Sequence, residues 1–411
     1  MFYDQLFTEA LSNPSHAIAY HVSRQLADAY PGRAILEGAE CVFDVERFAR
    51  AGLCQLRPDL SNHNQFWTTW NPETGVATGA RHAWFEVEWK GHWLDVILMN
   101  WDGCWDQHFW VVADSRPIAE RFFADVVGFN PEPEEELLVY QSSCWTPSES
   151  LFQAIQGATF ENLVLPGALK QEIAADLERF FAAQATYERY GVPWKRGILF
   201  IGPPGNGKTH AVKALVNAVK RPCIYVKSFA SEKYLISTNI RVVYDRARSL
   251  APCVVVLEDL DTLVDEESRS FFLNELDGFA TNAGVVTLAT TNHPEALDPA
   301  IIDRPSRFDR KYHFNLPGPA ERLAYVDLWE KTLQRDMRLT DAGRARVVEL
   351  CEGFSFAYLK ELFLASTMAW ITSAEAGGMD SVMAAQAQAL RLQMSTKPTA
   401  AEPKPAAAAA E

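Results

Sequence analysis

Residues 202–209 read Gly202-Pro203-Pro204-Gly205-Asn206-Gly207-Lys208-Thr209 and lie between an apolar run and a helical pattern. The apolar run covers residues 197–201, and the pattern that follows has its apolar face at Val212, Leu215, Val216 and Val219. A glycine-rich loop between a strand and a helix turns its backbone N–H groups inward and adds the positive end of the helix dipole. All eight residues are therefore predicted to bind a phosphate chain. The alternative is a plain glycine turn between strand and helix.

Lys208 and Thr209 end this loop and point to its cofactor. A lysine at this position reaches the β- and γ-phosphates of a nucleoside triphosphate, and the hydroxyl after it binds Mg²⁺. We therefore expect ATP and Mg²⁺ as cofactors.

A pair of carboxylates follows a second apolar run further along the chain. Residues 254–261 read Val-Val-Val-Leu-Glu-Asp-Leu-Asp. Two carboxylates at the end of a buried strand suit a metal-and-water site, in which one holds the Mg²⁺ shell and the next polarises the attacking water. We expect Glu258 to hold Mg²⁺ together with Thr209, and Asp259 to act on the water. The alternative is a buried strand that ends in a solvated acidic turn.

A third strand pattern and an arginine-rich stretch complete the predicted catalytic set. The apolar run over residues 285–289 ends at Thr290-Thr291-Asn292, where the amide of Asn292 can orient the attacking water or sense the γ-phosphate. Arg304 and Arg307 lie in the stretch that follows, and guanidinium groups can stabilise the charge of phosphoryl transfer, in cis or from a neighbouring subunit. Taken singly, Asn292 also fits a turn before Pro294, and the arginines also fit a solvated loop.

The periodicity of the chain predicts an α/β fold with further parts on either side. Strands are expected at 197–201, 223–226, 254–257 and 285–289, with helices between most of them, which is typical of a parallel sheet covered by helices. The expected organisation is an N-terminal α+β domain over 1–140, a linker over 141–158, a large nucleotide-binding subdomain over 159–318, a helical lid over 319–388, and a disordered tail over 389–411.

Composition and charge limit the class of protein. The chain has 411 residues, a formal net charge of -15 and a pI near 5.1, and no long Lys/Arg run, so we expect no nucleic-acid partner. Its 7 cysteines form no CxxC pair, which is typical of reduced thiols rather than of disulfides or zinc sites. No secretion signal and no apolar run long enough for a membrane span is visible. We expect a soluble cytoplasmic protein.

From about residue 159 to 330, the motifs resemble those of an AAA+ ATPase. Glu258-Asp259-Leu260-Asp261 resembles the Walker B motif, Asn292 the sensor-1 residue, and Arg304 and Arg307 the paired arginine fingers. Residues 273–279 resemble the family's inter-subunit signalling segment. The resemblance implies a P-loop ATPase module with a helical lid. It also implies a homo-oligomeric ring, expected to be a hexamer, with the finger arginines at the neighbour's γ-phosphate.

Within this family, the chain resembles the branch that contains the mitochondrial Rieske-protein translocase. Shared features are residues 194–197, the Glu-Asp order at 258 and 259, and residues 290–294. The order is Asp then Glu in most of the family, so here the metal-side carboxylate is one methylene longer and the water-side carboxylate one shorter. The absence of HExxH from the sequence predicts that no zinc protease is fused to this motor.

The N-terminal region resembles a transglutaminase-like fold near residues 81–95. His82 opens one strand and Asp95 lies on the next, so the two could pair across a hairpin and orient a nucleophile. Where that family has its nucleophilic cysteine, this sequence has Ser15. Three interpretations stay open: an ordinary sheet, a binding relic of the enzyme, or an active thiol or serine enzyme.

The expected function is an ATP-driven remodeller that unfolds or translocates a protein through a ring. Either Phe229 or Tyr234 could line the pore and grip the substrate, or simply pack. A nucleotide-dependent switch or assembly scaffold that signals through the N-terminal domain is the alternative. A catalytic N-terminal domain gated by the motor is a further one.

Overall fold

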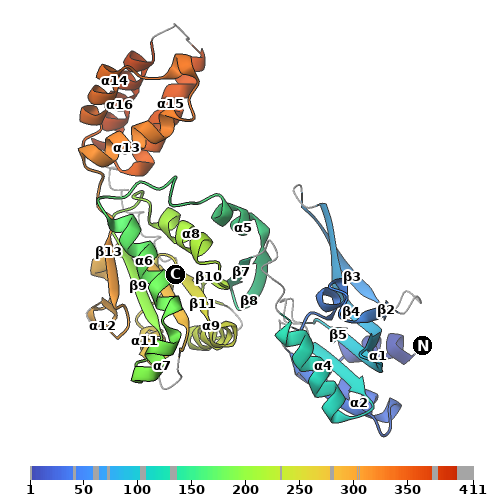
Figure 1. Ribbon diagram of the computed structural model, residues 1–411. Helices are drawn as coiled ribbons and strands as arrows, with labels where there is room; N and C mark the ends of the chain where they lie inside the picture. The colour runs from blue at the N-terminus through green and yellow to red at the C-terminus, as the bar shows by residue number, and fades with distance from the viewer. Residues whose placement is uncertain are drawn as a thin grey trace, which may run out of the picture. The chain divides into compact units, whose positions relative to one another are not determined.

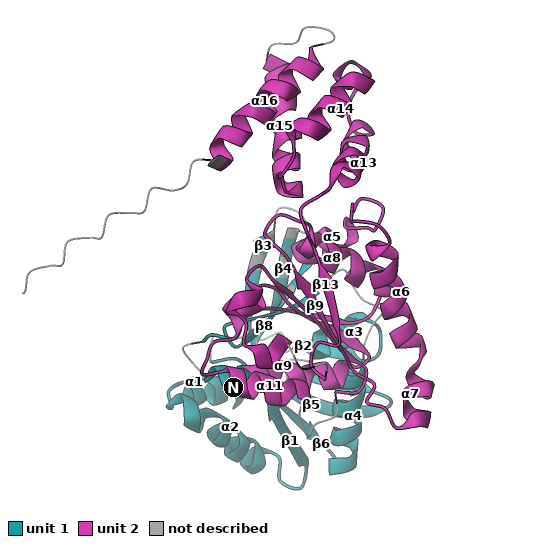
Figure 2. Ribbon diagram, turned by 90° about the vertical axis from the view of Figure 1, so that its left-hand side faces the viewer, with its two compact units in different colours: residues 1–149, 227–239 teal, residues 150–226, 240–411 magenta. Residues whose placement is uncertain are grey.

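The computed structural model describes residues 2–39, 43–58, 64–71, 75–101, 108–129, 137–231, 234–277, 282–302, 304, 306–372 and 378–395. The chain divides into two compact units (Figure 2). One unit consists of residues 1–149 and 227–239, and the other of residues 150–226 and 240–411. Each is described by itself below.

The first unit is built on a six-stranded antiparallel sheet (Figure 1). Its strand order is β1-β6-β5-β4-β2, and β3 pairs with the free part of β4. The strands are β1 (Ala34–Ala39), β2 (Gln55–Pro58), β3 (Gln65–Asn71), β4 (Gly75–Trp89), β5 (His92–Met99) and β6 (His108–Ala113).

Helices cover both faces of this sheet. Strand β5 is buried at every position from Leu94 to Met99, which requires a packed layer on each side. On one face, α1 (Phe2–Leu11) and α2 (Ser15–Ala29) pack against Ile97, Met99 and Trp110. On the other, α3 (Val45–Arg50) and α4 (Arg116–Gly128) pack against Val96, Leu98 and Phe109. The expected α+β architecture is confirmed.

Regular structure occupies the segment that we expected to be a linker. Strand β7 (Leu137–Gln141) forms a hairpin with β8 (Cys144–Ser148), and α5 (Glu149–Gln156) follows directly. Tyr140 and Ser143 of this hairpin both donate to the side-chain carbonyl of Asn239, at 2.8 and 2.9 Å. Residues 227–239 belong to the first unit, and these bonds join the last of them to the hairpin.

The second unit contains the expected parallel sheet. Its order is β13-β9-β12-β11-β10, and each of these neighbours is parallel to the next. The four strands predicted from the sequence are present, and β13 was not predicted. The strands are β9 (Arg196–Ile201), β10 (Cys223–Ser228), β11 (Cys253–Leu257), β12 (Val285–Thr291) and β13 (Arg310–His313).

Two helices precede the first of these strands, and others connect the strands, as the alternating pattern predicted. They are α6 (Leu169–Ala182), α7 (Gln184–Tyr190), α8 (Lys208–Val219), α9 (Ile236–Leu250), α10 (Leu260–Leu263), α11 (Arg269–Asp277) and α12 (Pro299–Ile302). Because the strands are parallel, the segments that follow β9, β11 and β12 all leave at one edge of the sheet.

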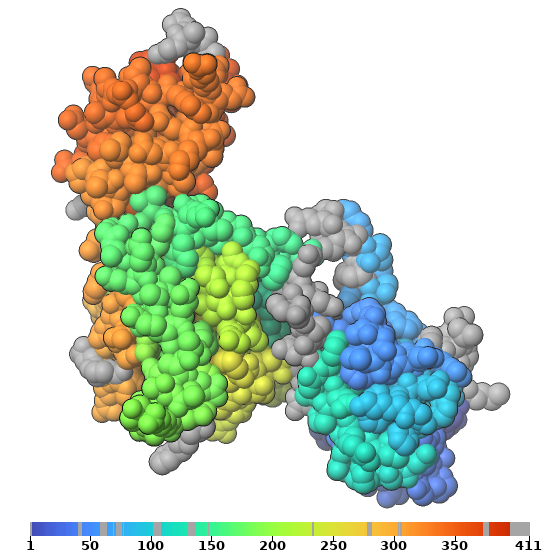
Figure 3. Space-filling model, viewed as in Figure 1, coloured from blue at the N-terminus to red at the C-terminus, as the bar shows by residue number. Residues whose placement is uncertain are grey.

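The C-terminal part is a helical lid with a core of its own. It contains α13 (Pro319–Glu330), α14 (Asp341–Leu350), α15 (Phe356–Thr372) and α16 (Met379–Ser395), which form a compact globule in Figure 3. Helix α16 continues to Ser395, so residues 389–395 are helical and not part of a disordered tail as predicted, while the rest of the predicted tail, residues 396–411, lies outside the described residues. No helix of the described residues is long and apolar enough to cross a membrane.

Candidate active site

The glycine-rich loop lies between β9 and α8, as its sequence predicted. Gly205 and Gly207 have φ angles of 79° and 88°, in the left-handed region that suits glycine. These turns bring the chain directly into α8, whose first residue is Lys208. The start of this helix faces a cavity of about 710 Å³ that Gly205, Gly207 and Thr209 help to line.

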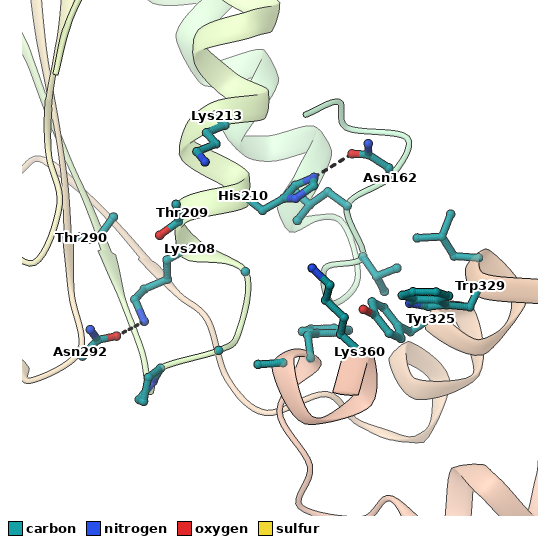
Figure 4. Close-up of a pocket in the computed structure, with 18 of the residues that line it drawn as sticks. Asn162, Lys208, Thr209, His210, Lys213, Thr290, Asn292, Tyr325, Trp329 and Lys360 are labelled. Carbon is teal, nitrogen blue, oxygen red and sulfur yellow. Dashed lines mark hydrogen bonds between the residues drawn. The ribbon is translucent and has the colours of Figure 1, made fainter. Parts of the chain in front are cut away.

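Lys208 forms three hydrogen bonds at the edge of the sheet, and Figure 4 shows the one to Asn292. Its Nζ donates to the backbone carbonyls of Gly202 and Pro203, at 2.5 and 3.0 Å, and to Oδ1 of Asn292 at 2.6 Å. Lys208 is only 6% exposed. Burial lowers its pKa, while Asp259 and its neighbouring carboxylates oppose that shift.

Asn292 also binds Asp259, the second of the two carboxylates that follow β11. Its Nδ2 donates to Oδ1 of Asp259 at 2.8 Å. The backbone N–H of Asp259 donates to Oγ1 of Thr290 at 3.0 Å, which fixes the turn after β11 against the end of β12. Asp259 has a φ of 50°, an uncommon conformation for a residue with a side chain. Asp259 and Asn292 both line the cavity, and Asp259 is exposed.

Glu258 has a different environment from Asp259. Its Oε2 accepts a hydrogen bond from the hydroxyl of Tyr225 on β10. Its Oε1 is buried and has no hydrogen-bond partner among the described residues. Burial and the bond to Glu258 raise the pKa of Tyr225 well above its usual range, so the phenol stays protonated and donates.

These oxygens fit a magnesium site. Mg²⁺ takes hard oxygen ligands and is held by one or two carboxylates or hydroxyls together with phosphates and waters. A buried carboxylate oxygen without a partner is costly unless a cation shell satisfies it. Glu258 offers such an oxygen but does not itself line the cavity, whereas Thr209 lines it and offers an exposed hydroxyl at the start of α8. These are the two residues that the sequence predicted as metal ligands.

The far wall of the cavity comes from the lid and from the segment before α6. The lid supplies Tyr325, Trp329 and Phe356, which offer apolar surface for a flat ring. The backbone N–H of Ala357 at the start of α15 donates to the carbonyl of Gly205 at 2.9 Å, so the lid is bonded to the glycine loop itself.

Asn162 and His210 form one corner of this cavity (Figure 4). The backbone N–H of Thr159 donates to Oδ1 of Asn162, which also lies 2.7 Å from Nε2 of His210. Burial lowers the pKa of His210. Sequence reasoning missed His210 and Tyr225 as site residues. The position of His210 directly after Thr209 was a usable signal, whereas Tyr225 requires the pairing of β10 with β11.

The two arginines predicted as fingers have different environments. Arg304 is exposed. Arg307 is 8% exposed, and its Nε donates to Oδ2 of Asp277 at 2.7 Å. Its Nη1 donates to the backbone carbonyl of Ala300. Within this chain, therefore, Arg307 is already bound, and neither arginine lines the cavity.

The possible pairing of His82 with Asp95 is not present, which favours the interpretation of an ordinary sheet. Strands β4 and β5 pair His82 with Met99 and Asp95 with Glu86, which separates the two residues by four positions, about 13 Å along the strands. Asp95 instead accepts from Arg33 at 2.6 Å and from the indole of Trp84 at 3.0 Å. Ser15 is exposed at the start of α2, and no hydrogen bond joins these three residues within the described structure.

The two aromatics considered for a pore also differ in exposure. Phe229 is 1% exposed, and its backbone carbonyl accepts a bond from Asn239 at 2.7 Å. Tyr234 is 45% exposed. The buried ring of Phe229 packs inside its unit, so of these two aromatics Tyr234 is the one exposed at the surface.

The model of the ATPase family associated with various cellular activities, abbreviated AAA, matches residues 198–316. This range contains the glycine-rich loop, both carboxylates, Asn292 and both arginines. It includes neither the N-terminal sheet nor any of the lid helices. Members of this family are ATPases that use ATP with Mg²⁺.

Curated relatives of this chain include proteins that act on other proteins. It is 35% identical over 231 residues to an ATP-dependent zinc metalloprotease FtsH of Acidothermus cellulolyticus, covering 52% of this chain and 33% of that protein. It is 37% identical over 183 residues to a putative 26S proteasome regulatory subunit homolog of Methanocaldococcus jannaschii, covering 41% and 48%. The chain thus spans between a third and a half of these relatives. Residues 198–316 thus match an ATPase domain of the AAA family, and this range contains the part of the cavity that the glycine-rich loop, Asp259 and Asn292 line.

Proposed function

We propose that this chain hydrolyses ATP in the described cavity and uses the cycle to unfold, translocate or remodel a protein substrate as a homo-oligomeric ring. One observation carries the proposal. Lys208 donates a hydrogen bond to Asn292, and Asn292 donates one to Asp259. These bonds join the segments that follow β9, β12 and β11 at one edge of the sheet, beside the glycine-rich loop. A cation, an amide and a carboxylate in that order suit a triphosphate and its attacking water.

The phosphate-binding and metal-binding residues have separate roles in the proposed reaction. The loop residues 202–209 bind the phosphates through backbone N–H groups, and Lys208 neutralises the β- and γ-phosphate oxygens. Thr209 and Glu258 hold Mg²⁺, which draws charge from the phosphate oxygens when it is bound.

Asp259 and Asn292 act on water in this scheme. Asn292 orients the water, and Asp259 accepts its proton as the water oxygen bonds to the γ-phosphorus. The bond from that phosphorus to the bridging oxygen of ADP breaks in the same displacement, so the products are ADP and inorganic phosphate.

We assign the role of the finger acting on a neighbouring subunit to Arg304 rather than to both arginines. Arg304 is exposed and no side-chain bond joins it to another described residue, whereas Arg307 is bound to Asp277. A guanidinium delivered by the next subunit makes the site complete only in an assembly, which is why we propose a ring, with six subunits as the expected number.

A protein substrate is the third part of the proposal. One relative is an ATP-dependent zinc metalloprotease, which acts on proteins, and another is a putative homolog of a 26S proteasome regulatory subunit. In this chain, Tyr234 offers an exposed ring next to Leu235, which is 75% exposed. We propose that this pair contacts an extended substrate.

The test is ATP turnover by the purified full chain, with and without a permanently unfolded protein. We expect Mg²⁺-dependent phosphate release that rises when the unfolded protein is added and is lost in Lys208→Ala. Turnover no greater than that of Lys208→Ala would overturn the proposal. Slow turnover that ignores the unfolded protein, together with ATP-dependent assembly, would instead support a switch or scaffold.

A further inference from the structure

Tyr225 lies on β10, which pairs with β11, and the carboxylates Glu258 and Asp259 directly follow β11. In the parallel pairing of β10 with β11, Tyr225 is aligned with Val256. Side chains alternate along a strand, so the residue two positions after Val256 faces the same side as Tyr225. That residue is Glu258, and the Tyr225 hydroxyl donates to its Oε2. The contact therefore follows from the sheet register.

The two oxygens of Glu258 are used unequally. Tyr225 holds Oε2, while Oε1 is buried and has no hydrogen-bond partner among the described residues. A single donor on one oxygen restricts rotation of the carboxylate about its last side-chain bond. The other oxygen is then held in one place, and the next residue along the chain, Asp259, lines the nucleotide cavity.

A glutamate at this position needs such a restraint more than an aspartate does. It has one more rotatable bond, so fixing its carboxylate costs more conformational entropy. The half-buried ring of Tyr225 is itself anchored in the sheet, and its hydroxyl can supply the restraint without a charge of its own.

We propose that Tyr225 is a positioning residue that fixes Glu258 so that its free oxygen Oε1 enters the Mg²⁺ shell. The proposal rests on the proposed function, because it assumes that Glu258 serves the metal of an ATP site. Tyr225 touches neither metal nor nucleotide in this scheme and acts only through Glu258.

The experiment measures metal affinity rather than turnover. Mn²⁺ binding to the full chain saturated with a non-hydrolysable ATP analogue is followed by electron paramagnetic resonance. In Tyr225→Phe, which removes only the hydroxyl, we expect the Mn²⁺ dissociation constant to rise on the order of tenfold, because hydrogen bonds to charged groups are stronger than neutral ones. The affinity for the analogue without divalent metal should stay within about twofold of the unsubstituted chain.

A double-mutant cycle shows whether the effect passes through Glu258. Glu258→Gln should weaken Mn²⁺ binding by itself, and adding Tyr225→Phe to it should change little more. The matched control is Tyr244→Phe, since Tyr244 is fully buried in the same chain and its hydroxyl lies 3.3 Å from Oγ1 of Thr287. Tyr244→Phe should leave the Mn²⁺ affinity unchanged, with all proteins measured below their melting temperatures.

The possible outcomes distinguish a failure of the role proposed for Tyr225 from a failure of the proposed ATPase function. If the unsubstituted chain binds Mn²⁺ with the analogue but Tyr225→Phe binds it equally well, only the role of Tyr225 is wrong. The same holds if Tyr225→Phe loses as much affinity when Glu258 is already glutamine. If the unsubstituted chain binds neither analogue nor Mn²⁺, the proposed function itself fails.

Discussion

Arg307 donates its Nε–H to Asp277 at 2.7 Å, and this pair joins the segment after α12 to the last residue of α11 within one chain. The guanidinium is 8% exposed, and it also donates to the carbonyl of Ala300. For Arg307 to reach a neighbouring subunit, both contacts would have to break. The geometry thus favours a structural role for Arg307 and leaves Arg304 as the candidate finger.

The first prediction concerns stability. Arg307→Ala should lower the free energy of unfolding by roughly 1.5–3 kcal/mol, the range for a hydrogen bond to a charged group. Asp277 keeps a weaker partner in Lys195 at 3.9 Å, which limits the loss. Arg304→Ala, at an exposed position, should change it by at most about 0.5 kcal/mol. Urea unfolding of the two variants measures both values, and equal losses would contradict the structural distinction between them.

The second prediction concerns catalysis between subunits. Arg304→Ala should bind ATP normally but hydrolyse it more slowly, by roughly 10³- to 10⁵-fold if it acts as other finger arginines do. Lys208→Ala should bind ATP poorly, because the loop loses its buried cation. Mixing the two inactive proteins should restore activity, since an intact loop on one subunit can then face an intact Arg304 on the next.

Phosphate release is measured across a range of mixing ratios, with subunit exchange followed by light scattering. Mixed assemblies that stay inactive at every ratio would show that Arg304 does not act between subunits. Recovery with Arg307→Ala in place of Arg304→Ala would return the finger role to Arg307.

The sequence was sufficient for the parts of the site that depend on local order. Strand, loop and helix are contiguous at residues 196–219, and parallel pairing then brings Asp259 and Asn292 to the same edge. The two arginines could not be distinguished in this way. Arg307 lies in a turn, and its partner Asp277 lies 30 residues earlier at the end of α11. Only packing of the folded chain brings them together.

The third prediction separates the two carboxylates. Asp259→Asn should keep ATP bound and slow hydrolysis by about 10²- to 10⁴-fold, because an amide cannot accept the proton of the attacking water. Glu258→Gln should instead raise the Mg²⁺ concentration for half-maximal turnover, on the order of tenfold, because a metal ligand loses its charge. Titrations of turnover against Mg²⁺ and of nucleotide binding distinguish them. Exchanged phenotypes would mean that the two roles are assigned in the wrong order.

The register between β4 and β5 explains why His82 and Asp95 do not lie opposite each other. Lys90 and Gly91 have φ angles of 49° and 78° and form a two-residue turn, which pairs Trp89 with His92 and sets every later pair of the hairpin. Counting back from that turn places Asp95 opposite Glu86. The turn at Lys90-Gly91 therefore determines which residues lie opposite each other. The presence of His82 and Asp95 in the sequence does not by itself show whether they do.

The fourth prediction concerns the boundary of the N-terminal part. The residues of its two hydrophobic cores all lie between Tyr3 and Phe129, and among the described residues none of these core members comes from the β7–β8 hairpin. We therefore expect a fragment of residues 1–129 to fold alone and to melt cooperatively without binding ATP. Calorimetry and tryptophan fluorescence of the fragment measure this. A fragment that unfolds gradually, with its buried Trp110 accessible to quenchers, would show that the rest of the chain is needed.

The last prediction is a pH dependence at His82. Burial, aided by the charge of Arg81, lowers the pKa of His82 from 6.5 to about 4, and the backbone N–H of Asn100 lies 3.4 Å from its Nδ1 as a donor. The unfolded chain therefore binds a proton at this residue between pH 6.5 and 4 that the folded chain does not. Stability should fall as the pH falls through that window, by about 3 kcal/mol in total. His82→Gln, which keeps an acceptor but cannot titrate, should flatten this part of the curve, whereas His16→Gln at an exposed position should not. Urea unfolding of the full chain from pH 7 to 4 measures the slopes, and an unchanged slope in His82→Gln would rule out His82 as its source.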